Sequence, residues 1–191
     1  MTYPPFPHEK YKIIMCDPPW RFKTWSAKGK GRGPEQHYHT MSIEDIKSLP
    51  VSELADDNCA LFLWTTGPML SQALQVLDTW GFKYKTTAFT WIKTNASGGI
   101  VLGLGFYTRS CTELCLLATK GSLARISADV SQGVFSRRRE HSRKPDEVRR
   151  RIVQLMGDLP RIELFARERI DGWDVWGDEV DLFTEKTDIF R

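Results

Sequence analysis

The tetrapeptide Asp17-Pro18-Pro19-Trp20 places an acid, two prolines and an indole directly after a short apolar run. Two prolines fix two φ angles and remove two N–H donors from the backbone. The tetrapeptide therefore offers hydrogen-bond acceptors, a carboxylate and backbone carbonyls, beside a flat stacking surface. The amino group of adenine needs these features before it can act as a nucleophile, because its lone pair is delocalised into the ring. Acceptors that bond both of its hydrogens favour the form in which the lone pair is localised on the nitrogen. A tight turn with a core tryptophan is the alternative that these four residues leave open.

Charge is spread unevenly along the chain, although the net charge is only +3. Residues 137–151 carry eight basic side chains against three acids, whereas residues 171–191 carry seven acids against two bases. A basic stretch can bind phosphates, so we assign Arg137, Arg138 and Arg139 to nucleic-acid binding. From charge alone, a solvated helix face followed by a loop explains the same residues equally well.

The elements that position these residues follow from apolar periodicity and turn residues. We expect strands at 11–16, 60–65, 88–92, 113–119 and 161–165, and helices at 42–49, 69–80 and 145–156. Strands that alternate with helices favour an α/β fold with a mostly parallel sheet, whose ligands bind beyond the carboxyl ends of the strands. Three loops are expected on that edge and assigned to substrate binding, at 21–40, 94–105 and 131–143.

Chain length and cysteine usage limit the protein class. The 191 residues suit a single catalytic domain, 1–191. The four cysteines include no Cys-x-x-Cys pair, and no two histidines stand at metal-ligand spacing, so we expect reduced thiols and no metal. No apolar run is long enough to cross a bilayer and the N-terminus lacks a signal-peptide pattern. We therefore expect a cytoplasmic protein, bacterial or in a phage-infected host, without a membrane partner.

An ordered series of motifs resembles the MT-A70 family of N6-adenine methyltransferases, over about residues 11–180. The motifs are IMCDPPW at 14–20, YHTM at 38–41, ALFLWTTG at 60–67, WGF at 80–82, TWIKTN at 90–95, a strand with Glu113 before Lys120-Gly121, RKPDE at 143–147 and RIELFAR at 161–167. The resemblance implies a Rossmann-like S-adenosylmethionine-dependent methyltransferase fold in permuted motif order, with helices on both faces of the sheet. It also implies methyl transfer from S-adenosylmethionine to the N6 amine of adenine.

The resemblance assigns catalytic and base-binding roles to the residues that match the family motif. Asp17 and the carbonyl of Pro18 hold the target amine, with Pro19 completing the turn. Trp20 and Tyr38 flank the base.

Cofactor binding is assigned by the same resemblance. Lys144, at the start of the helix expected from Pro145, binds the cofactor carboxylate, which a helix N-terminus also favours. The other cofactor contacts are assigned to Asp17, Glu163, Phe165, Arg167, Asp178 and Glu179, with Glu163 and Arg167 near the ribose and Asp178 and Glu179 near the adenine. Two features depart from the family pattern: an acid stands at Asp178 where an amide is common, and no histidine-asparagine pair follows Arg167, so Arg169 is an alternative ribose contact.

The substrate is assigned to DNA because the short chain lacks an RNA-binding appendage. Three alternatives stay open: an RNA N6-adenine methyltransferase, a catalytically silent nucleic-acid-binding subunit, and methylation of a small molecule or protein. Family analogy also suggests a homodimer.

Overall fold

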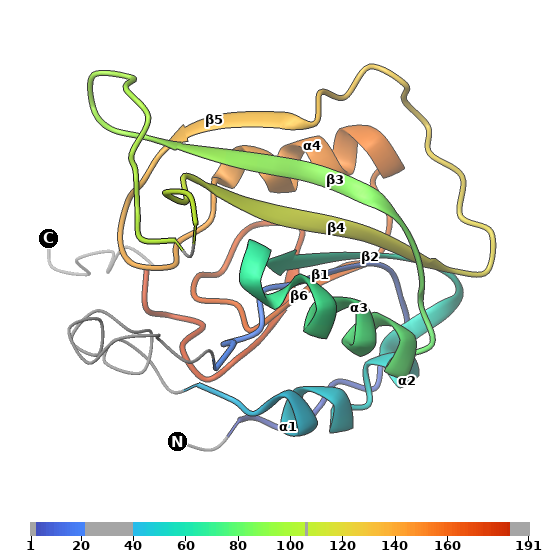
Figure 1. Cartoon of the computed structure of the whole chain (residues 1–191). Helices are drawn as coiled ribbons and strands as arrows, with labels where there is room; N and C mark the ends of the chain where they lie inside the picture. Colours follow the sequence, from blue (N-terminus) through green and yellow to red (C-terminus); the bar gives the residue numbers. More distant parts are fainter. Residues whose placement is uncertain (1–2, 22–39, 106, 184–191) are drawn as a thin grey trace, which may run out of the picture.

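Seven strands form one sheet in the order β5-β3-β4-β2-β1-β6-β7 in the computed structural model, which describes residues 3–21, 40–105 and 107–183 (Figure 1). β4 pairs antiparallel with β2 and β3, and the other four pairings are parallel. Among the described strands, β4 is therefore the one that is reversed, which confirms the mostly parallel α/β prediction. The strands are β1 Tyr11–Cys16, β2 Ala55–Thr65, β3 Lys83–Thr94, β4 Thr112–Lys120, β5 Gly133–Arg137, β6 Arg161–Leu164 and β7 Asp174–Trp176.

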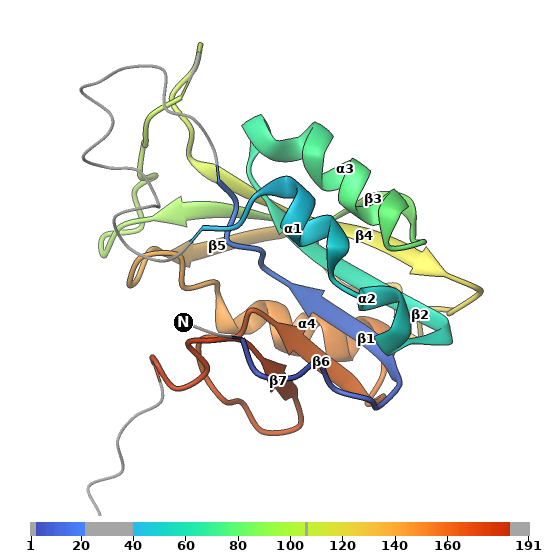
Figure 2. The ribbon, with the colours of Figure 1, turned by 90° about the horizontal axis from the view of Figure 1, so that it is seen from below.

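Helices cover both faces of the sheet, as expected (Figure 2). The short helices α1 and α2 and the longer α3 lie on one face, and α4 lies on the other. α1 begins where the Ser42 hydroxyl accepts from the Asp45 backbone N–H at 3.1 Å, a typical N-cap. Their bounds are α1 Ile43–Ser48, α2 Val51–Leu54, α3 Leu70–Thr79 and α4 Asp146–Met156, with a 3₁₀ turn, η3, at Gly67–Met69.

The central strand β1 is buried on both faces, because alternate side chains point to opposite sides of a sheet. Ile14 and Cys16 pack into the core beneath α1 and α3, whereas Ile13 and Met15 pack into the core beneath α4. This double burial explains why the strand is a continuous apolar run, and it holds the residue that follows Cys16 at the edge of the sheet.

The prediction of a loop over 131–143 is partly wrong, because Gly133–Arg137 form the edge strand β5 beside β3. Val134 is fully buried there, and the Trp91 indole N–H donates to the Ser136 carbonyl at 2.9 Å. The apolar Phe135 next to the buried Val134 is 70% exposed, so the sequence shows no alternation of apolar and polar residues, and this edge strand was missed. The short elements α2 and β7 were also missed, and Pro145 caps α4 instead of occupying its first turn.

The other two predicted loops have different outcomes. Residues 95–105 contain turns and one isolated bridge to Thr94, so a loop there is confirmed. Most of the loop predicted at 21–40 lies outside the described residues. None of the helices in the described parts of the chain is long and apolar enough to cross a membrane.

Candidate active site

Four strands bring three predicted site residues, together with Glu113, to one edge of the sheet. Asp17 follows the end of β1, Phe165 follows β6, and Asp178 lies beyond the end of β7. Glu113 reaches the same edge from the beginning of β4, because that strand runs in the opposite direction. A pocket opens there, and it is lined by Tyr3, Asp17, Pro18, Pro19, Ser142, Phe165, Arg167, Asp178 and Glu179.

Seven of the residues that line this pocket were predicted from the sequence, and Tyr3 and Ser142 were not. Tyr3 stacks on Trp176 with ring centroids 4.8 Å apart and meets Phe165 edge-on at 5.7 Å. The pocket therefore has one aromatic wall, built by the N-terminal segment together with the ends of β6 and β7.

Among the residues that the structure describes, two non-glycine residues adopt left-handed backbone conformations, and both line the pocket: Ser142 at φ 64° and Phe165 at φ 59°. Such conformations cost about 1–3 kcal/mol each and persist where the surrounding structure holds them. The left-handed turn at Phe165 ends β6 and changes the direction of the chain. Two residues later, the Nε of Arg167 donates to the Glu179 carboxylate at 2.7 Å. Strain is thus located at the pocket walls.

An alternating row of charges runs beside the pocket, from Asp17 through Lys144 and Glu113 to Lys93. The Lys144 Nζ lies 2.6 Å from the Asp17 carboxylate and 3.2 Å from that of Glu113, and Lys93 pairs with the other Glu113 oxygen. The Lys144 side chain is only 9% exposed, so these pairs are weakly screened by water. We call these four residues the charge row.

The charge row shifts the pKa values of its two acids in opposite directions. Burial raises the pKa of Asp17 above its ordinary value, and the neighbouring Lys144 ammonium only partly opposes this effect. Burial also acts to raise the pKa of Glu113, but Lys144 and Lys93 together bring that pKa below its ordinary value. Asp17 is thus the carboxyl that needs a hydrogen-bond donor or a cation to stay ionised, since it depends on one lysine where Glu113 has two.

The proline carbonyls of the motif accept hydrogen bonds from backbone N–H groups of other residues. The Trp20 N–H donates to the Pro18 carbonyl at 2.8 Å, and the Met41 N–H donates to the Pro19 carbonyl at 2.9 Å. A carbonyl oxygen has two lone pairs, so Pro18 keeps one for a ligand.

Trp20 is not an open stacking surface, which corrects its predicted role beside the base. Its side chain is buried in the core and 6% exposed, and its indole N–H donates to the Trp64 carbonyl at 3.0 Å. Trp20 therefore anchors the turn that positions Asp17. Tyr38, the other residue expected beside the base, lies outside the described residues.

Glu163 does not face the pocket, which corrects its assignment to the ribose. Both of its carboxylate oxygens accept hydrogen bonds from Arg149, at 2.7 and 3.1 Å, and the residue is 6% exposed. The alternation of β6 turns Glu163 toward α4, where the guanidinium lies. Arg169, the alternative ribose contact, is an exposed residue that pairs with Asp181 at 2.8 Å and is not among the residues that line the pocket.

The three arginines assigned to phosphates divide into two groups. Arg137 and Arg138 are exposed at the end of β5. Arg139 instead makes a two-pronged pair with Asp146, with both N···O distances at 2.7 Å, so its guanidinium already has a carboxylate partner in this structure and its assignment to phosphate stays a prediction. Its partner is an acid seven residues later in the chain, which the phosphate interpretation did not consider.

Several residues of the site carried signals that sequence reasoning overlooked. Glu113 is an acid at the start of an apolar strand, which is unusual unless the acid has a partner. Arg149 stands three residues before the buried Ile152, and hence on the buried face of α4. The four cysteines are free, with Cys16, Cys59 and Cys115 buried as expected. No cluster suited to a metal ion occurs among the residues that the structure describes.

The pocket suits a ligand that joins an aromatic ring, hydroxyl groups and opposite charges. Carboxylates from Asp17, Asp178 and Glu179 face it and match a sulfonium, an ammonium or ribose hydroxyls, while Phe165 and Tyr3 offer apolar surface. Arg167 lines the pocket and Lys144 lies beside Asp17, so both cations are close enough to the pocket to be candidates for binding a ligand carboxylate. These groups fit S-adenosylmethionine.

Comparison with known proteins agrees with this geometry. The chain is 34% identical to the Type II methyltransferase M.MunI of Mycoplasma sp., with 94% of this chain and 82% of that protein aligned. It is 30% identical to an N(6)-adenosine-methyltransferase MT-A70-like protein of Arabidopsis thaliana and 28% identical to the human N(6)-adenosine-methyltransferase catalytic subunit METTL3. It spans only 22% and 28% of those two proteins. The MT-A70 family model matches residues 11–179, so the chain belongs to the MT-A70 family of methyltransferases.

Proposed function

We propose that this chain transfers a methyl group from S-adenosylmethionine to the N6 amine of adenine in DNA. The observation that carries the proposal is the Asp17 carboxylate, which stands at the end of a strand buried on both faces and borders the pocket. DNA is favoured because the bacterial Type II methyltransferase aligns over most of its own length, whereas the eukaryotic relatives align over about a quarter of theirs. The reaction is expected in the cytoplasm.

The cofactor, when bound, supplies an electrophilic methyl group on a sulfonium. In the proposal, Lys144 binds its carboxylate, while Arg167, Phe165, Asp178 and Glu179 surround its ribose and adenine. All except Lys144 line the pocket, and Lys144 lies directly behind Asp17. The pocket acids make the site electronegative, which favours a cationic methyl donor over its neutral product.

Asp17 activates the target amine by accepting hydrogen bonds from it. Lys144 now contacts the Oδ2 atom of Asp17, so the amine must compete with this ammonium or use the remaining acceptor positions. A ligand carboxylate near Lys144 would draw the ammonium away from Asp17 and leave that oxygen for the amine. The second lone pair of the Pro18 carbonyl offers a further acceptor. The chain thus contributes positioning and electrostatics.

The target base has to leave a duplex stack before it can reach Asp17. A single-stranded substrate avoids that cost, which is a few kcal/mol for a paired base. We therefore expect faster turnover on single-stranded DNA than on a duplex of the same sequence when both are saturating.

Methyl transfer from labelled S-adenosylmethionine to matched DNA and RNA oligonucleotides, followed by nucleoside analysis, tests the proposal. N6-methyladenine in DNA supports it, and N6-methyladenosine in RNA alone replaces DNA with the RNA alternative. Labelled cofactor that binds in calorimetry without any transfer identifies a silent subunit.

A further inference from the structure

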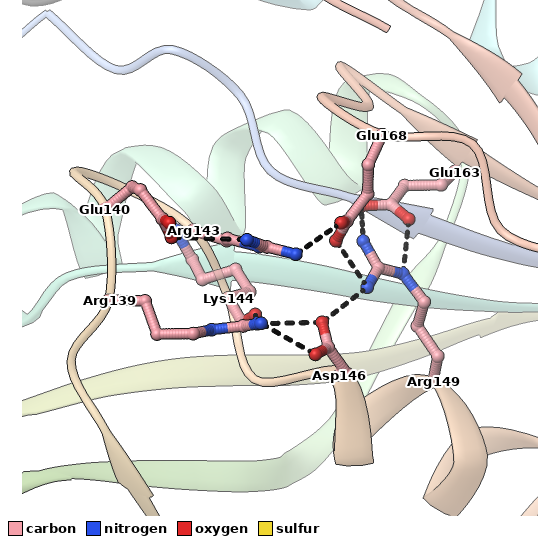
Figure 3. A network of polar contacts seen from close by, with 8 residues as sticks. All are labelled: Arg139, Glu140, Arg143, Lys144, Asp146, Arg149, Glu163 and Glu168. Carbon is pink, nitrogen blue, oxygen red and sulfur yellow. Dashed lines mark hydrogen bonds and ion pairs between the residues drawn. The ribbon is translucent and has the colours of Figure 1, made fainter. Parts of the chain in front are cut away.

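A second group of charges lies between α4, the end of β6 and the segment that precedes α4 (Figure 3). It alternates guanidinium groups with carboxylates and extends to the backbone of Lys144. We call this group the arginine clamp; its members are Arg139, Arg143, Asp146, Arg149, Glu163 and Glu168.

Arg149 is the hub of the clamp and contacts all three of its acids. Its guanidinium bonds both oxygens of Glu163, one oxygen of Glu168 at 3.1 Å and one of Asp146 at 3.3 Å. The Arg149 side chain is 8% exposed, and those of Glu163 and Glu168 are 8% and 6% exposed. This buried hub ties the first turn of α4 to the end of β6 and to the segment after it.

Two further arginines, Arg139 and Arg143, connect the acids around Arg149 to the segment that contains Lys144. Arg139 bonds both oxygens of Asp146 and donates to the Lys144 carbonyl at 2.8 Å. Arg143, the residue before Lys144, donates to Glu168 at 2.8 Å. In Figure 3 these guanidinium groups converge from the 139–144 segment on the acids of α4 and of the β6 end.

The clamp explains how a strained backbone is held next to Lys144. Ser142, in the left-handed region, lies between Glu140 and Lys144, and the clamp fixes the chain on both sides of it. A guanidinium bonded to both oxygens of a carboxylate fixes the orientation of the two side chains as well as the distance between them. A lysine at the same position would fix only the distance. The three arginines face three carboxylates, so the group is balanced in charge and is built for rigidity.

We propose that Arg139, anchored through Asp146 to Arg149, is a positioning residue that sets where the Lys144 ammonium lies and so determines recognition of the cofactor carboxylate. The proposal rests on the function proposed above. It separates Arg139 from its neighbours Arg137 and Arg138, although the three arginines are adjacent and identical in type. It also predicts that the effect of Arg139 is confined to ligands that carry a carboxylate where Lys144 can reach it.

Calorimetry with two ligands tests this proposal. S-adenosylhomocysteine carries the amino-acid carboxylate, and 5′-methylthioadenosine lacks it but keeps the adenine and ribose. Arg139→Gln is expected to weaken S-adenosylhomocysteine binding by about tenfold, the effect of losing one charge-assisted contact. It should leave 5′-methylthioadenosine binding within about twofold of wild type. Arg138→Gln, with the same charge change one residue away, should alter neither affinity.

A second pair of variants uses Asp146 and its neighbour. Asp146→Asn removes the partner of Arg139 at a half-exposed site, so the fold should tolerate it. It should reproduce the ligand-selective loss, and the double variant should lose no more than Arg139→Gln alone, because Asp146 acts through Arg139. Glu147→Gln is the matched control. Glu147 follows Asp146 in the first turn of α4, but it pairs with Arg151, which is not part of the clamp. Arg139→Lys should be intermediate, because an ammonium cannot form the fork.

Two results would overturn the inference. If Arg139→Gln binds S-adenosylhomocysteine as well as wild type does, Arg139 does not position Lys144. If both ligands lose affinity equally, the residue is merely structural. Wild-type protein that binds neither ligand would instead overturn the proposed function, and with it this inference.

Discussion

The charge row and the arginine clamp share one edge of the sheet but are built differently. In the charge row, two acids alternate with two lysines, and the row borders the pocket through Asp17. In the clamp, guanidinium forks bond carboxylates in pairs, and its hub is almost fully buried. Lysine is a compact charge on a flexible stem, whereas the planar fork of arginine fixes orientation. In our proposals, the row exchanges partners with a ligand, and the clamp holds the row in place.

The largest effect should come from breaking the charge row at Asp17. Asp17→Ala is expected to reduce kcat by about a hundredfold or more, because the acceptor for the amine is lost in the transition state. The unfolding midpoint should fall little, since removing this acid ends an unfavourable burial. Single-turnover methyl transfer measures the effect. Turnover within about tenfold of wild type would remove Asp17 from its catalytic role.

Breaking the clamp at its buried end should lower stability and leave kcat nearly unchanged, which is the opposite of the effect expected for Asp17→Ala. Glu163→Gln is expected to lower the free energy of unfolding by about 2 kcal/mol, because a charge-assisted pair with Arg149 is lost in a buried site. Chemistry in the protein that remains folded should be nearly unchanged, since Glu163 does not face the pocket. Urea unfolding monitored by tryptophan fluorescence provides the measurement. A large loss of kcat with unchanged stability would restore Glu163 to the ligand site.

Lys144→Ala should weaken S-adenosylmethionine binding by about tenfold and nucleic-acid binding much less. It should also shift the pH profile. Burial raises the pKa of Asp17 and Lys144 opposes this, so without Lys144 the pKa rises further. With saturating cofactor, the acid limb of kcat should therefore move to higher pH in the variant. Unchanged cofactor affinity together with an unmoved acid limb would make Lys144 an ordinary ion-pair residue.

The smallest effect concerns the exposed arginines outside the clamp. Each phosphate contact contributes about 0.9 to the salt slope of binding, so replacing Arg137 and Arg138 with glutamine should flatten that slope by up to about two units. Adding Arg139→Gln should flatten it no further, since Asp146 already neutralises that guanidinium. Oligonucleotide titrations at several salt concentrations distinguish these cases. A slope that the double variant leaves unaltered would locate the phosphate path elsewhere, with 21–32 as the next segment to test.

The parts of the fold that could be predicted from the sequence are those with strong local patterns. β1 matches its predicted bounds because it is a continuous apolar run that ends at two prolines. The helix at 145–156 was recognisable from its acidic first turn and apolar face, and it differs only at Pro145. Asp17, Phe165 and Asp178 were expected near the ligand, and they line one pocket because parallel strands share one edge.

The residues whose partners the sequence did not indicate are those whose partners depend on how the elements pack and on where the chain turns. Glu163 and Arg149 are separated by 14 residues and meet only because α4 packs behind β6. Trp20 donates to Trp64 across 44 residues, so its burial depends on how β1 and β2 pair. The charges of Arg137, Arg138 and Arg139 are identical in sequence, and only the direction of the chain leaving β5 decides which of them meets Asp146.

The reversal of β4 has a further consequence for how the site can diversify. Antiparallel neighbours are joined by a hairpin and need no crossover helix, so the β3–β4 connection can change length without disturbing the order of the strands. That connection begins at Asn95, at the same edge as the pocket, and β4 re-enters the sheet beside Glu113. New recognition segments can thus be grafted between residues 95 and 111 while the charge row and its ligand contacts are inherited intact, which makes this hairpin a natural place to exchange target preference.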